Sequence, residues 1–474
     1  MGREVVLVAG RDPRTEVSGG HSAYVRSYAR AALAAGYSPH LFCAAPDSRV
    51  EETELGVVHR VASPVRPFRQ MVAGAHARWV ARGIVRFARE LPPSARRGRR
   101  EETAAGDGGR LLVHGFGVWG CIAVRAVADL ARSGREAVAV VSSYTTYEDE
   151  AHAKVLGSGS YGAGRRLQAA LEHLWVRLAV ERWERRAYLG AARVLVNYES
   201  VRRLIAAKYG DAARCQLLPY TCEAAFRQPD GRYPGKRFEE EFRHGLGLGE
   251  LLESSAALEP RTPGKLQEPW RGQESAAVPA DAKEPGGGAA ATQAPLVVAV
   301  ARHDPRKGLD VLLRALALLR AGGVPLRACL VGGGPLIEAH RQLAAKLGLG
   351  ESVAIVGPVP EIPPYLAPAD VFVLPSRSEQ SGSLSLLEAL LAGKAVVASA
   401  VDGIPEDVTD GVDALLVPPD DPAALAGALR RVLADPGLRA RLARRGAATF
   451  AARFAPAVVA SALRELYTGL GAPP

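Results

Sequence analysis

Two carboxylates in the second half of the chain stand where a hydroxyl-rich anionic ligand could bind. Glu379 and Glu388 flank a polar loop with Gly382, which follows an apolar run at 369–374 and precedes apolar residues at helical spacing from Leu384 onward. This order predicts a strand, a loop and a helix. Carboxylates accept hydrogen bonds from hydroxyls, glycine lets backbone approach closely, and the N–H groups at a helix start attract anions. The combination suits a phosphate-bearing polyol.

A strand–loop–helix unit upstream supplies positive charge. Leu296–Val300 predicts a buried strand, and the loop after it contains Arg302 and Lys307 before a helix that runs through Arg320. In an open parallel sheet, ligands bind outside the carboxyl ends of the strands. Cations fixed at that edge would stabilise the negative charge of an anionic ligand without a metal.

The stretch around the two glutamates resembles the signature of retaining glycosyltransferases of the GT-B fold, family GT4 (glycosyltransferase group 1). That pattern is P-S-x-x-E-G-F-G-x-x-x-L-E-A-M-A-x-G-x-P-V-V-A, which 387–398 follows closely. The family separates its glutamates by seven residues, whereas eight lie between Glu379 and Glu388. Either Glu379 or Gln380 therefore fills the position that contacts the sugar. Taken alone, this spacing is more typical of an ordinary βα unit with surface glutamates, and the companion motifs favour the family.

The resemblance implies an α/β fold of the GT-B class, in which two Rossmann-like parallel-sheet domains face a cleft. Residues 301–308 resemble the family motif G-R-x-x-x-x-K-G, which holds the donor diphosphate. The resemblance assigns Arg302 and Lys307 to the diphosphate, Glu379 or Gln380 to the sugar ring, Glu388 to the ribose hydroxyls, and Val359 to the nucleobase. It also makes the loop residues Ser381 and Gly382, and Ser383 at the helix start, candidates for substrate binding.

The first half carries weaker signals of the same kind. A β-loop-α-β opening implies a parallel sheet, and its loop contains Gly19 and Gly20, where the family places a contact to the diphosphate or the acceptor. A strand predicted at 110–113 ends at His114, which resembles the family's H-G loop and becomes a candidate for a sugar hydroxyl contact. A structural histidine is the alternative.

Hydroxyls and acids follow the next predicted strand, at 137–142. Tyr144, Tyr147 and Glu148 are candidates for recognition of the acceptor. The neighbouring acids lack the spacing of a metal site, so solvated charge is the expected role, and no metal is predicted.

Composition divides the chain into four parts. We expect an acceptor-side domain at 1–226, a linker or insertion at 227–295, a nucleotide-sugar domain at 296–455, and a helix at 456–474 that returns to the first domain. The linker is rich in Pro, Gly and charge and poor in apolar residues, so it cannot bury a core.

The totals limit the function classes. A net charge of +10 favours anionic partners, but no nucleic-acid-binding motif is present. Five scattered cysteines indicate neither a disulfide framework nor a zinc site, and Gly332–Gly334 lacks the dinucleotide fingerprint, so no cofactor is expected. Without an evident membrane span or signal peptide, we expect a cytoplasmic location.

A cationic, partly amphipathic segment at 65–89 allows two interpretations. It has arginines at 78, 82, 86 and 89 beside apolar residues. A helix lying on the inner, anionic face of a membrane would have this character. A helix with its arginines in water and its apolar side in the core is the favoured alternative.

The expected activity is transfer of a sugar from a nucleotide-diphosphate-sugar donor to a hydroxyl acceptor, which could be a glycan, a lipid-linked molecule or a small molecule. The resemblance implies retention at the anomeric carbon and no metal. A nucleotide-sugar epimerase of the same fold, and a weakened binding or scaffold protein, remain alternatives.

Overall fold

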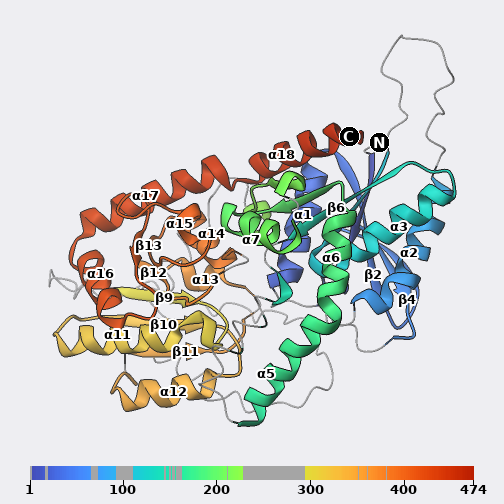
Figure 1. Ribbon diagram of the computed structural model, residues 1–474. Coiled ribbons are helices and arrows are strands. Elements are labelled where there is room, and N and C mark those ends of the chain that lie inside the picture. The colour runs from blue at the N-terminus through green and yellow to red at the C-terminus, as the bar shows by residue number, and fades with distance from the viewer. Residues whose placement is uncertain are drawn as a thin grey trace, which may run out of the picture.

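The computed structural model describes residues 3–15, 20–65, 73–91, 110–143, 146–148, 151, 155, 163–210, 212–227, 294–350, 352–359, 361–379 and 382–474. These residues form two α/β units, each built on its own sheet (Figure 1). The predicted linker at 227–295 lies almost entirely outside the described residues.

The first sheet has eight strands in the order β3-β4-β2-β1-β5-β6-β7-β8. Their bounds are β1 Arg3–Val8, β2 Tyr37–Ala45, β3 Arg49–Thr53, β4 Gly56–Ala62, β5 Leu111–Phe116, β6 Ala137–Ser143, β7 Arg193–Val196 and β8 Cys215–Leu217. All neighbours pair in parallel except β3 and β4, which form an antiparallel hairpin at the edge. The sequence analysis missed this hairpin because β3 reads R-V-E-E-T and has no apolar run.

Helices cover both faces of this sheet. They are α1 Gly20–Ala34, α2 Ala73–Glu90, α3 Gly120–Arg132, α5 Ala163–Trp175, a π-helical segment Val176–Val180, α6 Glu181–Gly190, α7 Glu199–Tyr209 and α8 Glu223–Arg227, with 3-10 turns at Gly117–Trp119 and Ala212–Arg214. Helix α2 packs on α3, which packs on α6, while α1 lies on the other side of the sheet (Figure 1). The arginines of α2 point outward and its apolar side is buried, as favoured for 65–89.

The second sheet is entirely parallel, in the order β11-β10-β9-β12-β13-β14. Its strands are β9 Leu296–Val300, β10 Arg327–Val331, β11 Val353–Val356, β12 Val371–Leu374, β13 Ala395–Ser399 and β14 Leu415–Val417. Its helices are a 3-10 turn Pro305–Lys307, α11 Leu309–Ala321, α12 Ile337–Lys346, α13 Pro363–Leu366, α14 Leu384–Leu391, α15 Ile404–Asp407, α16 Pro422–Ala434 and α17 Pro436–Arg453.

The last helix, α18 (Pro456–Gly469), packs on α1 of the first unit (Figure 1). By length and mean hydropathy (1.3), Pro436–Gly469 could cross a membrane. This stretch is divided at Phe454 into α17 and α18, and α17 packs on α14 and β13. Both helices therefore bury apolar faces inside the fold.

Strand order places two loops side by side: the loop after β9, which contains Arg302 and Lys307, and the loop after β12, which contains Glu379. Strand β9 pairs with β12, so the loops that follow their carboxyl ends are neighbours. Gly308 (φ 59°) sits so close to the second loop that an added Cβ would lie 2.0 Å from the carbonyl oxygen of Pro375. The backbone N–H of Arg377 donates to the carbonyl of Arg306 at 2.7 Å. The two loops are therefore fastened backbone to backbone.

Candidate functional site

The neighbouring loops bring Lys307 and Glu379 into direct contact. Lys307 Nζ lies 2.5 Å from Glu379 Oε1, and the Ser376 hydroxyl donates to the same oxygen at 2.6 Å. The Glu379 side chain is 1% exposed and that of Lys307 19% exposed. A carboxylate this buried is stable only when paired and hydrogen-bonded, which both partners provide.

Asp402 fixes the backbone of the same loop. Its Oδ2 accepts from the N–H of Glu379 at 2.6 Å and from the hydroxyl of Ser378 at 3.0 Å. Asp402 has φ 47°, a left-handed conformation that costs energy outside glycine. The sequence analysis missed Ser376, which stands inside the polar loop that it singled out, and Asp402, which lies farther along the chain.

Two arginines beside the ion pair differ in freedom. Arg302 is 65% exposed, and its Nε lies 3.8 Å from Asp304 Oδ2, at the limit of an ion pair. Arg377 is clamped by Asp310 and by Asp420, each at 2.7 Å, and these hydrogen bonds raise its pKa above the usual range. Arg302 is therefore the cation that can turn toward a ligand.

Glu388 lies half-buried on α14, where it faces the first unit. Burial raises the pKa of its carboxyl to about 7, and the charge of Glu223 adds to the rise. Its side-chain carboxyl has no hydrogen-bond partner in the part of the chain that the structure describes, whereas its backbone carbonyl accepts from Ala392. Ser383 begins the helix, and its side chain accepts from the N–H of Leu386.

The raised pKa of Glu388 predicts a pH effect on stability. An acid whose pKa is higher in the folded state than unfolded holds its proton on folding, so stability falls as pH rises from about 4.5 through about 7. In Glu388→Gln the titrating carboxyl is absent, so we expect its stability to decrease less with rising pH. Above pH 7 its melting temperature should be higher than that of the parent. Thermal unfolding of both proteins from pH 5 to pH 8.5 measures this difference. Parallel curves of melting temperature against pH would contradict the prediction.

Three tyrosines of the first unit pack against Gly382. An added Cβ there would lie 2.8 Å from the hydroxyls of Tyr24 and Tyr198 and 3.0 Å from the ring of Tyr220, and Gly382 has φ 81°. All three tyrosines are buried. The predicted sugar loop is thus in contact with the other half of the molecule.

Two of these tyrosines donate hydrogen bonds to α15. Asp407, 1% exposed, accepts from the hydroxyls of Tyr198 at 2.5 Å and Tyr220 at 2.6 Å. Next to it, the carboxylate of Glu406 accepts from the backbone N–H groups of Glu199 and Ser200, at the start of α7. The N–H groups and partial positive charge at a helix start favour a carboxylate. Glu406 and Asp407 of α15 therefore form a hydrogen-bonded joint between the two units.

His114 is not brought to this site. Strand β5 continues to Phe116, so His114 lies inside the strand, opposite Val140, rather than after its end. It is fully buried, and its two ring nitrogens lie 2.7 Å from the Tyr467 and Ser142 hydroxyls. Burial lowers its pKa to about 3. The interior position corrects the expectation of a ligand-facing loop histidine.

The remaining candidates are placed as follows. Val359 is half-buried in the loop after β11, and Gly20 begins α1. Tyr147 donates its N–H to the buried Glu184, and Glu148 pairs with Lys208 at 2.5 Å. Gly19, Gln380, Ser381 and Tyr144 lie outside the described residues.

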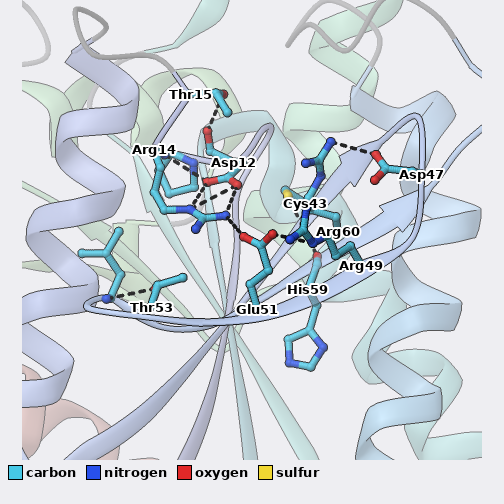
Figure 2. A network of polar contacts seen from close by, with 12 residues as sticks. Asp12, Arg14, Thr15, Cys43, Asp47, Arg49, Glu51, Thr53, His59 and Arg60 are labelled. Atoms are coloured by element: carbon cyan, nitrogen blue, oxygen red, sulfur yellow. Dashed lines mark hydrogen bonds and ion pairs between the residues drawn. The ribbon is translucent and has the colours of Figure 1, made fainter. Parts of the chain in front are cut away.

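A polar network holds the loop after β1 (Figure 2). Arg14 Nη2 lies 2.6 Å from both Asp12 Oδ2 and Glu51 Oε2, which links the loop to the β3–β4 hairpin. On the hairpin, Arg60 pairs with Asp47 at 2.7 Å. The loop that leads toward Gly19 is therefore fastened at the carboxyl edge of the first sheet.

Among the described ranges, no group of three or more His, Cys, Asp or Glu side chains is arranged to hold a metal ion.

Comparison with known proteins identifies the second unit. Residues 294–435 match the family described as Glycosyl transferases group 1. These residues belong to that family. The GDP-mannose-dependent alpha-(1-6)-phosphatidylinositol monomannoside mannosyltransferase of Mycolicibacterium smegmatis is 39% identical over 150 residues, 30% of this chain and 39% of the relative. The D-inositol 3-phosphate glycosyltransferase of Streptomyces avermitilis is 40% identical over 178 residues, 35% of this chain and 38% of the relative. This chain thus spans about two-fifths of the length of these two relatives.

Solved structures extend the likeness in fold to nearly the whole chain. Sucrose-phosphate synthase from Thermosynechococcus elongatus has a TM-score of 0.67 at 20% identity, with 99% of each chain covered. Anabaena HepE in complex with UDP has a TM-score of 0.61 at 16% identity, with 99% of this chain and 100% of that chain covered. WaaG, a glycosyltransferase involved in lipopolysaccharide biosynthesis, scores 0.61 at 16% identity, with 98% and 100% covered. At identities this low, the structural likeness establishes the fold alone. That fold is GT-B, which confirms the predicted fold class.

Proposed function

We propose that this chain is a retaining glycosyltransferase that moves a sugar from a nucleotide-diphosphate sugar to a hydroxyl acceptor without a metal. The observation that carries the proposal is the buried Lys307–Glu379 pair beside the exposed Arg302, at the carboxyl ends of two neighbouring strands. The group 1 match over 294–435 supports it.

In this proposal, the second unit holds the donor. Arg302 and Lys307 neutralise the diphosphate, and Glu379 or Gln380, with Ser381 and Gly382, contacts the sugar. The further contacts are Ser383 at the helix start, Glu388 on the ribose and Val359 on the nucleobase. HepE was solved with UDP, and the Mycolicibacterium smegmatis relative is GDP-mannose-dependent by name, so a uridine or guanosine diphosphate donor is our first choice of ligand class.

The chemical step needs little from side chains. The bond between the anomeric carbon and the phosphate oxygen breaks, and the acceptor oxygen bonds to that carbon on the same face. The acceptor proton passes to the leaving phosphate oxygen. The protein positions the reactants and stabilises the growing phosphate charge, the role we give to Arg302 and Lys307.

The first unit would present the acceptor. Residues 1–226 form this side, residues 296–455 the donor side, and 456–474 the returning helix. Tyr147 and Glu148 are the proposed acceptor contacts, held by Glu184 and Lys208. The relatives act on inositol phosphate and on a phosphatidylinositol mannoside by name, so we propose a hydroxyl-bearing acceptor at the inner face of a membrane.

Arg302→Ala tests the donor site. Because Arg302 is exposed and not locked by neighbours, we expect donor KM to rise and kcat/KM to fall about 100-fold, with an unchanged melting temperature. Arg314→Ala, at an exposed position on α11, is the matched control and should behave like the parent.

The measurement has two stages. Thermal shift with UDP, GDP and ADP selects the nucleotide, and release of that nucleotide from its sugar donor reports turnover. Unchanged turnover in Arg302→Ala would remove this residue from the mechanism. Donor interconversion that never requires an acceptor would favour the epimerase alternative.

A further inference from the structure

Helix α5 and the π-helical segment after it expose an apolar stripe. Leu167, Leu171, Leu174 and Leu178 are 62%, 57%, 53% and 58% exposed. Their spacing of four, three and four residues puts them on one helical face. The opposite face is anchored, because Val176 and Val180 are buried in the first unit. In Figure 1, α5 extends away from the body of the molecule.

Exposed cations surround this stripe. Arg166 and Arg177 lie beside it, and α6 continues the same helical rod with exposed Arg182, Arg185 and Arg186. Because α6 packs on α3 and α3 on α2, the exposed arginines of α2 belong to the same outer layer. They are Arg78, Arg82, Arg86 and Arg89. The stripe thus continues into the cationic side of α6, and α2 adds arginines to the same layer of helices.

We propose that the leucine stripe of α5 docks on an anionic lipid bilayer, with the arginines of α6 and α2 against the headgroups. Apolar side chains enter the boundary between headgroups and acyl chains, and clustered arginines are attracted by the negative surface of the membrane. Charge complementarity selects this partner. The stripe has the composition of an interfacial helix, whereas α2 has its apolar side buried in the core and can contribute charge alone.

A second copy of the chain fits the stripe less well. The four leucines span about three helical turns, whereas a helix pair held by such a seam needs about three or more heptads. Pairing two stripes would also bring the flanking arginines of both copies together, which like-charge repulsion opposes.

The docked face is connected to the acceptor side of the molecule. Arg177 Nε lies 3.5 Å from Glu148 Oε1, and Lys208 pairs with Glu148 from α7. This step rests on the proposed function: a lipid-linked hydroxyl acceptor would meet the Tyr147–Glu148 contacts close to the membrane surface.

The experiment uses the full chain and sedimented vesicles. One set contains phosphatidylcholine alone and the other contains phosphatidylcholine with phosphatidylglycerol. We expect the parent to bind the anionic vesicles, and added salt to weaken the binding. The double variant Leu171→Ser/Leu178→Ser should bind at least about tenfold more weakly. Leu318→Ser is the control, because Leu318 is also an exposed leucine (47%) but lies on α11 of the second unit.

Each outcome decides the proposal. No binding by the parent, or equal binding by the double variant, overturns it. A dimer in sedimentation velocity that the double variant lacks, without vesicle binding, identifies a second copy as the occupant instead. Nucleotide thermal shifts on the same proteins should stay unchanged, so loss of the membrane contact is distinguishable from failure of the donor site.

Discussion

Lys307→Ala should sharply reduce donor turnover and destabilise the second unit at the same time. The variant removes the ammonium group from Glu379, which is 1% exposed and keeps the Ser376 hydroxyl on the same oxygen. Leaving a buried carboxylate without its cation costs about 3 kcal/mol. The lost diphosphate contact should lower kcat/KM by about 1000-fold.

A matched variant separates the two effects. Glu379→Gln keeps a hydrogen-bonding side chain and leaves unpaired only the Lys307 ammonium, which is 19% exposed, so its melting temperature should fall less than that of Lys307→Ala. Its turnover should still fall if this residue contacts the sugar. Differential scanning calorimetry and nucleotide release measure both. A Lys307→Ala protein with the turnover and melting temperature of the parent would remove the ion pair from the site.

The second unit could be predicted well because its sheet is parallel and buried on both faces. Such strands read as continuous apolar runs, for example Leu296–Val300 and Ala395–Ser399. Their strand order could not be read directly, yet it creates the site: β9 lies beside β12 although about seventy residues separate them. Only the resemblance to the family indicated that the loops after β9 and β12 belong to one site.

The prediction for His114 failed because strand length is poorly marked in an apolar run. The expected strand ended at the first polar residue, whereas β5 continues through His114 to Phe116. Strand β5 has buried neighbours, and two hydroxyls supply hydrogen-bond partners for the imidazole. A polar residue after an apolar run therefore marks a strand end only when nothing inside the fold can satisfy it.

The joint between the two units had no local sequence signal. Tyr198 and Tyr220 lie in loops of the first unit, and Asp407 reads as part of a polar P-E-D turn. Only the fold brings them together and buries the carboxylate, whose pKa burial raises to about 7. Contacts this distant in sequence are invisible without homologues or coordinates.

Gly382→Ala should inactivate the protein through this joint. The residue has φ 81°, and its added Cβ would meet the hydroxyls of Tyr24 and Tyr198 at 2.8 Å. The left-handed conformation alone costs an alanine about 1 to 2 kcal/mol. The clash must in addition move either the tyrosines or the loop that carries Glu379, so we expect kcat/KM to fall at least about 100-fold.

Gly393→Ala distinguishes strain from displacement. Gly393 also has positive φ (61°), but its added Cβ would meet nothing within 4 Å. It should therefore lose a similar stability to backbone strain and keep the donor KM of the parent. If both variants lose activity equally, strain explains the effect and the tyrosine contact does not. If Gly382→Ala retains the activity of the parent, the contact between the two units does not position the donor loop.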